Sequence, residues 1–208
     1  MHAPELGEQY PDLVTQEHTL ELGMWIFLTS EALLFSALFA LYAGYRLMYP
    51  EDFARAIQAN TRWFGTANMY VLLTSSLTAA LSVGAIRRDR ARACARWLSL
   101  TALLGAAFLV LKGVEYARHF HEGSLPGPYY QDARLPTFGA NRFFTIYWVM
   151  TGFHALHVTA GVCVVLWMAV RARLGRYTRA HHTRLEMGTL YWHLVDVVWI
   201  FLWPLLYL

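Results

Sequence analysis

The sequence contains few charged residues: Asp, Glu, Lys and Arg make up 15% of its 208 residues, against about 25% in an ordinary soluble domain. Hydrophobic residues account for 57%. This balance excludes a soluble globular protein of usual composition and favours an integral membrane protein. No motif typical of nucleic-acid recognition accompanies the small net charge of +3, so we expect no nucleic-acid partner.

The sequence is also poor in cysteine. Its two cysteines, Cys94 and Cys163, indicate neither a disulfide framework nor a cysteine-based metal cluster. The N-terminal tail, residues 1–21, contains no Lys or Arg, so we do not expect a cleaved signal peptide there. Low-complexity tracts and repeats with a period of about 20–50 residues are absent as well.

The sequence does contain five long apolar runs. A helix needs about 20 apolar residues to cross a bilayer, and such runs occupy residues 22–45, 66–86, 97–116, 143–170 and 187–208. The longest connection, residues 117–142, is too short to fold independently. We therefore predict an all-α protein, an integral membrane bundle of five transmembrane helices over residues 22–208, preceded by a cytoplasmic tail of residues 1–21.

Arginine residues indicate the orientation of this bundle in the membrane. The second and fourth connections lie on the same side as the tail and carry ten arginines: Arg87, Arg88, Arg90, Arg92, Arg96, Arg171, Arg173, Arg176, Arg179 and Arg184. The other side carries six: Arg46, Arg55, Arg62, Arg118, Arg134 and Arg142. Ten against six favours an N-terminus in the cytoplasm, or matrix, and a C-terminus outside. The location we predict is a bacterial inner membrane, with the C-terminus in the periplasm.

Ionisable side chains inside the apolar runs are the candidate functional residues. They are Glu31, Lys112, Glu115, His154, His157, His193 and Asp196. A charge at mid-bilayer costs about 2.5–3.5 kcal/mol on insertion scales, so these groups should face the bundle interior, pair, or stay neutral. Given a helical rise of about 1.5 Å per residue, the three histidines and Asp196 lie at depths that predict one buried polar layer with Glu31.

The spacing of these residues suggests specific partners. Lys112 and Glu115 lie three residues apart on one helix face, which predicts an ion pair near the outer end, with the lysine extending towards the interface. His193 and Asp196 have the same spacing, so the carboxylate would orient or protonate the imidazole. Glu31 has apolar neighbours, and we expect a neutral acid unless a histidine or a lipid amine pairs with it; either way it is a candidate proton or lipid site.

The stretch FHALHVTAG, residues 153–161, leaves three interpretations of its two histidines open. They are metal or haem ligands, buried hydrogen-bonded side chains, or groups for proton or lipid-headgroup binding. No Glu-x-x-His motif of the di-iron bundles occurs in the sequence, and we favour the buried, hydrogen-bonded interpretation. We place His119 and His121 in a solvated loop, and we expect neither a metal ligand nor a catalytic residue in this chain.

Two functions of other classes stay open at this stage. A small proton-coupled transporter would use the intramembrane Glu, Asp and His residues as a relay, although the sequence has no internal repeats. A haem-binding membrane anchor would use the histidines as axial ligands.

Four stretches resemble subunit III of the haem-copper oxidases: GMWIFLTSEALLF at 23–35, FLVLKGVEY at 108–116, TGFHALHVTAG at 151–161, and EMGTLYWHLVDVVWIFLWPLLYL at 186–208. They touch four of the five predicted helices, in the order found in the family. The resemblance implies an accessory subunit that holds no haem or copper itself. Those cofactors are expected in the catalytic subunit I beside it, with subunit II as a further partner.

The resemblance also implies phospholipids bound between helix groups, and a role in oxygen access and sustained proton uptake. Glu31 falls on the membrane-buried, carbodiimide-reactive glutamate of the family. Many members have seven helices, and this chain begins near the third of them. Five-helix forms occur in quinol oxidases, in some cytochrome c oxidases and in a group linked to nitric oxide reductase, so the resemblance leaves the electron donor open.

Overall fold

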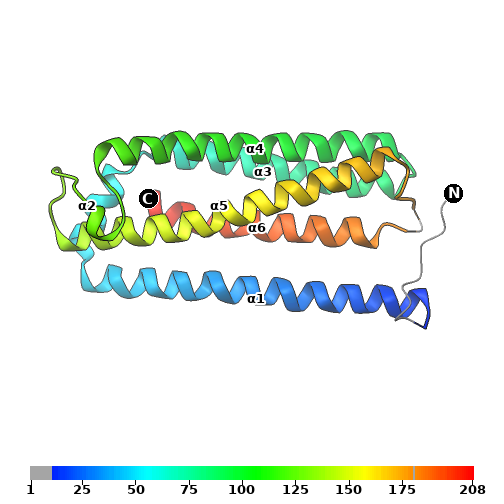
Figure 1. The fold of residues 1–208 in the computed structure, drawn as a ribbon, viewed down its shortest axis with the longest axis horizontal. Coiled ribbons are helices and arrows are strands. Elements are labelled where there is room, and N and C mark those ends of the chain that lie inside the picture. Colours follow the sequence, from blue (N-terminus) through cyan, green and yellow to red (C-terminus); the bar gives the residue numbers. More distant parts are fainter. Residues whose placement is uncertain (1–10, 180) are drawn as a thin grey trace.

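The computed structural model describes residues 11–179 and 181–208, and these form an elongated bundle of helices (Figure 1). The elements are α1 (Leu13–Met48), α2 (Pro50–Ala59), α3 (Arg62–Ile86), α4 (Ala91–Glu122), the 3-10 turn η1 (Gly127–Tyr129), α5 (Phe138–Arg173) and α6 (Thr183–Tyr207). Five of them, α1, α3, α4, α5 and α6, are long and apolar enough to cross a membrane. The predicted all-α class with five spanning helices is therefore confirmed.

Several helices run beyond the apolar stretches that predicted them. Helix α1 begins at Leu13, inside the expected tail, where the carboxylate of Asp12 accepts a hydrogen bond from the Thr15 backbone N–H at 2.6 Å. Such a cap satisfies a backbone donor that the first turn leaves free. Helix α4 ends at Glu122 and is capped by Gly123, whose φ of 76° is a left-handed conformation that favours glycine. The first ten residues of the predicted tail lie outside the described residues.

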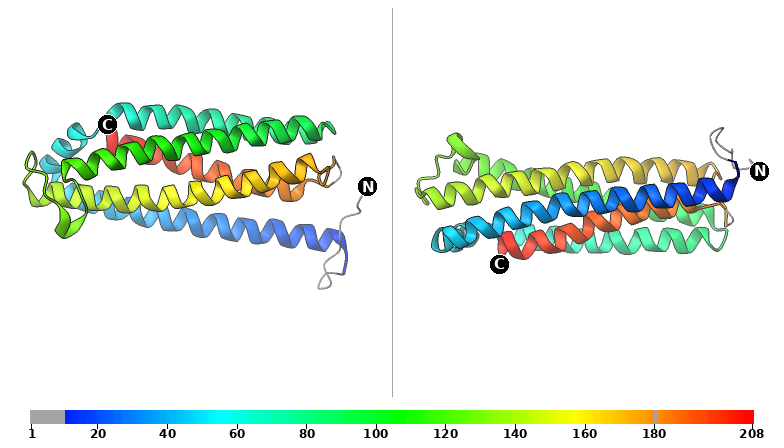
Figure 2. Two further views of the ribbon diagram at one scale, coloured as in Figure 1. Left: turned by 45° about the horizontal axis from the view of Figure 1, so that its top comes forward. Right: turned by 90° about the horizontal axis from the view of Figure 1, so that it is seen from below.

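Four of the long helices form a closed bundle, and the fifth lies against its side. Helix α3 packs against α4 and α6, and α5 packs against the same two helices. Helix α1 contacts α5 and α6 along the outside of the bundle (Figure 2). The arrangement therefore creates a long seam between α1 and α5 on the side of the four-helix bundle.

Helix α1 meets the bundle through one narrow stripe. Its buried or half-buried positions between residues 24 and 45 follow alternating steps of four and three: Met24, Leu28, Glu31, Phe35, Leu38, Tyr42 and Tyr45, with Phe39 beside them. This spacing keeps one line of side chains facing a neighbouring helix. Glu31 occupies a position in this stripe that would otherwise hold an apolar residue.

Close helix contacts inside the bundle depend on glycine. A Cβ atom added to Gly105 of α4 would lie 2.5 Å from the Trp192 ring, and one added to Gly161 of α5 would lie 2.8 Å from it. The indole of Trp192 on α6 therefore fits between these two helices only because both positions lack a side chain. Small residues at helix contacts are typical of bundles in lipid.

The end of the bundle that carries the C-terminus has additional elements. Helix α2 and the segment 123–137 lie there, whereas α1 begins at the opposite end (Figure 1). Phe53 of α2 is fully buried and packs against Tyr42 and Phe143, with a ring-centroid distance of 5.4 Å to each. Helix α2 thereby connects α1 to the core at this end.

Candidate functional site

Glu31 and His157 form a pair between α1 and α5. His157 Nε2 lies 2.7 Å from Glu31 Oε2, and the imidazole and carboxylate side chains are 14% and 19% exposed. The other ring nitrogen, Nδ1, lies 2.7 Å from the carbonyl oxygen of Phe153. Because a carbonyl oxygen can only accept a hydrogen bond, Nδ1 carries a proton.

This geometry determines the proton content of the Glu31–His157 contact. Either the neutral carboxylic acid donates to Nε2 of a neutral imidazole, or an imidazolium donates to an ionised carboxylate. Both states hold one proton between the two groups and have the same total charge. A proton can therefore shift across the contact without adding net charge to the membrane interior.

A groove of about 150 Å³ opens between α1 and α5 on the side of the pair that faces the C-terminal end. Its lining residues are Leu38, Leu41, Tyr45, Arg142, Thr145, Ile146 and Val149. Leu38 follows Glu31 by seven residues on the same stripe, a distance of about 10 Å along the helix. The groove thus has apolar walls and one cationic side chain, Arg142, whose guanidinium carbon lies 4.4 Å from the centre of the Phe138 ring.

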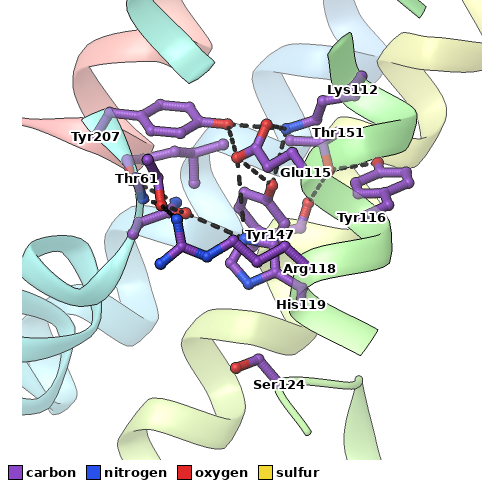
Figure 3. Close-up of polar contacts among 12 residues, drawn as sticks. Thr61, Lys112, Glu115, Tyr116, Arg118, His119, Ser124, Tyr147, Thr151 and Tyr207 are labelled. Atoms are coloured by element: carbon purple, nitrogen blue, oxygen red, sulfur yellow. Dashed lines mark hydrogen bonds and ion pairs between the residues drawn. The ribbon is translucent and has the colours of Figure 1, made fainter. Parts of the chain in front are cut away.

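A second polar site lies inside the bundle around Lys112 and Glu115, whose side chains are 2% and 1% exposed. Figure 3 shows its polar contacts. Lys112, the single lysine of the sequence, donates to Glu115 Oε2 at 3.0 Å and to the hydroxyl oxygens of Tyr147 and Tyr207 at 2.8 Å each. Both tyrosines donate in turn to Glu115 Oε1, at 2.8 and 2.6 Å. Every N–H of the ammonium group therefore has an acceptor, as a buried charge requires.

Aromatic rings surround the same ammonium group. Lys112 Nζ lies between 4.6 and 5.5 Å from the ring centres of Tyr116, Tyr147, Trp199 and Tyr207. Rings at this range attract a cation through their negative faces. The side chain of Lys112 is 2% exposed, so the prediction that it extends towards the interface is wrong: the tyrosines and Glu115 satisfy it inside the bundle.

His119 extends this cluster towards the end of α4. The sequence suggested a solvated loop histidine, but α4 continues to Glu122 and the His119 side chain is 4% exposed. Its Nε2 lies 3.2 Å from Asn60 Oδ1 and 3.9 Å from Glu115 Oε1, and its Nδ1 lies 3.9 Å from Glu122 Oε2. His121, by contrast, is exposed.

His193 and Asp196 do not form the expected pair. His193 Nδ1 is hydrogen-bonded to the hydroxyl group of Ser76 on α3 at 2.7 Å. Asp196 is buried beside Ser75 and Ser76. Among residues 11–179 and 181–208, no hydrogen bond or ion pair links either residue to Glu31. The predicted single polar layer is therefore divided between the α1–α5 seam and the α3–α6 contact.

His154 is buried without the hydrogen bonds that we expected for it. Its ring stacks on Trp199 at 5.0 Å between centroids and meets the edge of Phe108 at 5.5 Å. Neither ring nitrogen has a hydrogen-bond partner in the described part of the chain. The position one helical turn from His157 thus serves aromatic packing in the bundle core, and the two histidines of FHALHVTAG have different environments.

The segment 123–137 is held to the end of α4 by ionic hydrogen bonds. Arg134 donates to Asp132 at 2.6 and 2.9 Å and to Glu122 at 3.0 Å. These bonds from the guanidinium lower the pKa of the buried Asp132 carboxyl to about 2 and raise the pKa of Arg134. Ser124 donates a further bond to Asp132 at 2.8 Å.

Sequence reasoning missed the residues that complete the buried cluster. Tyr147, Tyr207 and Asn60 come from other parts of the chain than Lys112, and each is at most 3% exposed. The signal that could have revealed them is that their polar groups lie at the same depth in the bundle as Lys112 and Glu115. As for metal binding, the described residues contain no group of three or more His, Cys, Asp or Glu side chains placed to hold an ion.

The five spanning helices, with the Lys112–Glu115 ion pair enclosed between them, define a multi-pass membrane protein. The sequence profile of the family described as cytochrome c oxidase subunit III matches residues 8–208. The chain therefore belongs to this family, the third subunit of the haem-copper oxidases, which implies a complex with the catalytic subunits.

Named relatives agree with this assignment. The chain is 34% identical to cytochrome c oxidase subunit 3 of Thermostichus vulcanus, over 90% of this chain and 86% of the relative. It is 31% identical to quinol oxidase subunit 3 of Bacillus spizizenii, over 90% and 85%. A third relative, cytochrome c oxidase subunit 3 of Bacillus sp. PS3, is 29% identical over 100% and 98%.

Proposed function

We propose that this chain is the non-redox accessory subunit III of a haem-copper terminal oxidase, where it stabilises the catalytic subunit, binds phospholipid and supports proton uptake and oxygen access. The observation that carries the proposal is the Glu31–His157 contact at 2.7 Å. It places one shared proton at a partly exposed seam of the bundle. Such a group can exchange a proton with a neighbouring subunit while the surrounding helices stay in place.

The groove beside this pair supports the lipid part of the proposal. Its walls are apolar and suit an acyl chain, and Arg142 supplies the positive charge that an anionic headgroup requires. The groove lies on the same seam as Glu31, at the half of the bundle nearer the C-terminus. A lipid held there would cover the seam and limit the access of water to the pair.

We assign the redox chemistry to the partners. Subunit I is expected to hold haem and copper, with subunit II as a second neighbour, and this chain holds no cofactor. Cytochrome c is the electron donor we favour, because the profile and two of the relatives above carry that name. The quinol oxidase relative makes quinol the alternative donor, and an association with nitric oxide reductase is a further alternative.

For the orientation, we propose a cytoplasmic N-terminus in a bacterial inner membrane. The turns between α3 and α4 and between α5 and α6 lie at the end where α1 begins (Figure 2). Those turns and the adjoining helix ends carry the larger share of arginines, and positive charge is retained on the cytoplasmic side. The C-terminus, α2 and the segment 123–137 then face the periplasm.

Replacing Glu31 tests this function. Glu31→Gln keeps the shape of the side chain and removes its titratable carboxyl group. In the purified complex we expect an unchanged haem spectrum and an initial oxygen-consumption rate within about twofold of wild type, because the change leaves the redox centres in place. We also expect faster loss of activity during continuous turnover and altered phospholipid retention. The matched control is Glu51→Gln on α2, whose side chain is 85% exposed.

Two results would contradict the proposal. One is loss of the haem spectrum in an assembled Glu31→Gln complex, which would place this residue at a cofactor. The other is a complex with the turnover stability and lipid content of wild type, which would leave the pair without the proposed role.

A further inference from the structure

We propose that His119 is a proton relay between the outer aqueous phase and the buried cluster of Lys112, Glu115, Tyr147 and Tyr207. This role is separate from the Glu31 seam, because the residues involved lie on α4 and its neighbours. Its basis is a row of charged and titratable groups along one face of α4, at positions 112, 115, 119 and 122. Steps of three and four keep these side chains on one face of the helix.

The tautomer of His119 follows from the neighbouring amide. Asn60 Nδ2 donates to the carbonyl oxygen of Leu206 at 3.0 Å, so the amide oxygen is the atom that faces His119. That oxygen can only accept, which places a proton on His119 Nε2. In the neutral imidazole, Nδ1 is then the basic nitrogen.

The basic nitrogen of His119 faces outwards. Nδ1 is buried and has no hydrogen-bond partner among the described residues, yet Glu122 Oε2 lies 3.9 Å away on the outer side. The Glu122 side chain is 20% exposed and pairs with Arg118 and Arg134. A proton arriving from water thus meets a carboxylate at the surface and an available nitrogen directly behind it.

The inner side of the His119 ring faces Glu115, which is the proton acceptor in this proposal. Nε2 lies 3.9 Å from Glu115 Oε1, and a movement of the imidazole by about 1 Å brings this pair to hydrogen-bond distance. Glu115 is ionised when it pairs with Lys112. The imidazole therefore has a carboxylate on each side, one exposed and one enclosed.

The transfer consists of two balanced steps. A proton from water bonds to Nδ1 and gives an imidazolium, which the Glu122 carboxylate stabilises. The Nε2–H bond then breaks and an O–H bond forms at Glu115 Oε1, which leaves a neutral imidazole and a neutral carboxyl group. The original tautomer returns when Nδ1 releases its proton to water and Nε2 takes up a proton from water. The Asn60 amide oxygen favours this tautomer, because it requires a donor.

The four aromatic rings around Lys112 allow Glu115 to become neutral, because they continue to stabilise the ammonium group. After the transfer, Lys112 loses the charge of its partner, and an isolated buried ammonium group would be costly. Two tyrosine oxygens at 2.8 Å remain as acceptors, and four rings still surround Nζ. These contacts stabilise the cation without requiring an ionised carboxylate.

The groups around His119 come from every neighbouring element. On α4 they are Glu115, Glu122 and Arg118; α5 contributes Tyr147, with its ring centre 5.1 Å from the imidazole, and the apolar Phe144. The connection between α2 and α3 contributes the uncharged Asn60 and Thr61, α6 contributes Tyr207 through Glu115, and the segment 123–137 contributes Arg134 through Glu122. Negative charge lies on both sides of the ring, and the arginines contact the outer carboxylate.

Hydrogen–deuterium exchange of the buried tyrosine hydroxyl groups tests the relay. The full-length chain in lipid nanodiscs is transferred to D2O, and infrared bands of the cluster are identified as those lost in Tyr207→Phe. We expect His119→Gln, which retains an amide for Asn60, and Glu122→Gln, which leaves the imidazole in place, each to slow the exchange at least tenfold. His121→Gln, at the exposed neighbouring histidine, should exchange at the wild-type rate.

Three results would overturn or decide the relay. Wild-type exchange in a folded His119→Gln or Glu122→Gln protein shows that protons reach the cluster by another route. A wild-type cluster that does not exchange shows that it is closed to protons. If His119→Gln does not fold, as judged by circular dichroism, Glu122→Gln alone decides, since its side chain lies at the surface.

Discussion

The hydroxyl oxygen of Tyr207 lies 2.6 Å from Glu115 Oε1, although the two residues are 92 positions apart in the sequence. The same hydroxyl group accepts a hydrogen bond from Lys112 at 2.8 Å. The last turn of α6 is thereby joined to the C-terminal third of α4 through a buried ion pair. This contact makes the C-terminal turn part of the bundle core rather than a frayed helix end.

Removing the Tyr207 hydroxyl group should therefore destabilise the bundle. Tyr207→Phe leaves Lys112 without one acceptor and Glu115 without one donor, so we expect the free energy of unfolding to fall by about 1–3 kcal/mol. Titration with a denaturing detergent, followed by circular dichroism, measures this change. Tyr70→Phe on the exposed face of α3 is the control and should have no measurable effect.

The buried ion pair predicts a specific pattern in a double-mutant cycle. Lys112→Met leaves the Glu115 carboxylate enclosed without its cation, and we expect a loss of about 3–5 kcal/mol in the free energy of unfolding. Adding Glu115→Gln removes the unpaired charge, so the double variant should recover more than half of that loss. If the double variant instead loses as much unfolding free energy as the two single variants added together, the two side chains do not stabilise each other.

The position of the Tyr207 ring depends on Gly65. A Cβ atom on Gly65 would lie 2.7 Å from this ring, and the ring cannot retreat without breaking the hydroxyl contacts with Lys112 and Glu115. Gly65→Ala should therefore cost about 1–3 kcal/mol of unfolding free energy. Gly84→Ala in the same helix meets no atom within 4 Å and should keep or slightly raise the stability. Equal effects of the two substitutions would rule out this close contact.

The apolar runs predicted the five crossings because a bilayer allows few other structures for them. The helix ends were not predictable in the same way. Helix α4 continues past Tyr116 to Glu122, and Arg118 and Glu122 pair there at 2.7 Å across one turn. Such charged residues lower the hydropathy of the segment, yet the helix persists, and His119 is buried as a result.

Local spacing explains which part of the site could be predicted. The contact between Lys112 and Glu115 depends on residues three apart, so one helix determines it. The tyrosine partners come from α5 and α6, and their positions depend on how the helices pack. In the same way, the sequence indicated that Glu31 needs a partner such as a histidine, but only the contact of α1 with α5 selects His157 over His154.

Asp132 predicts a pH dependence for the segment 123–137. Its pKa in the folded state is about 2, below the ordinary value of 3.8, because Arg134 stabilises the carboxylate. The stabilisation is therefore complete above about pH 4 and is lost as the pH falls through 2. We expect the free energy of unfolding to fall by roughly 1–2 kcal/mol over that interval, measured by thermal unfolding in detergent. Asp132→Asn should remove this part of the pH dependence, and an unchanged profile in that variant would contradict the assignment.

The most direct test of the account is purification of the affinity-tagged chain from its native membrane, followed by optical spectra and metal analysis of the complex and of the separated chain. We predict that a large catalytic subunit co-purifies, that haem and copper remain with it, and that the separated chain contains neither. Stoichiometric haem or copper on the separated chain, or the absence of a catalytic subunit, would contradict the assignment of this chain as an accessory subunit.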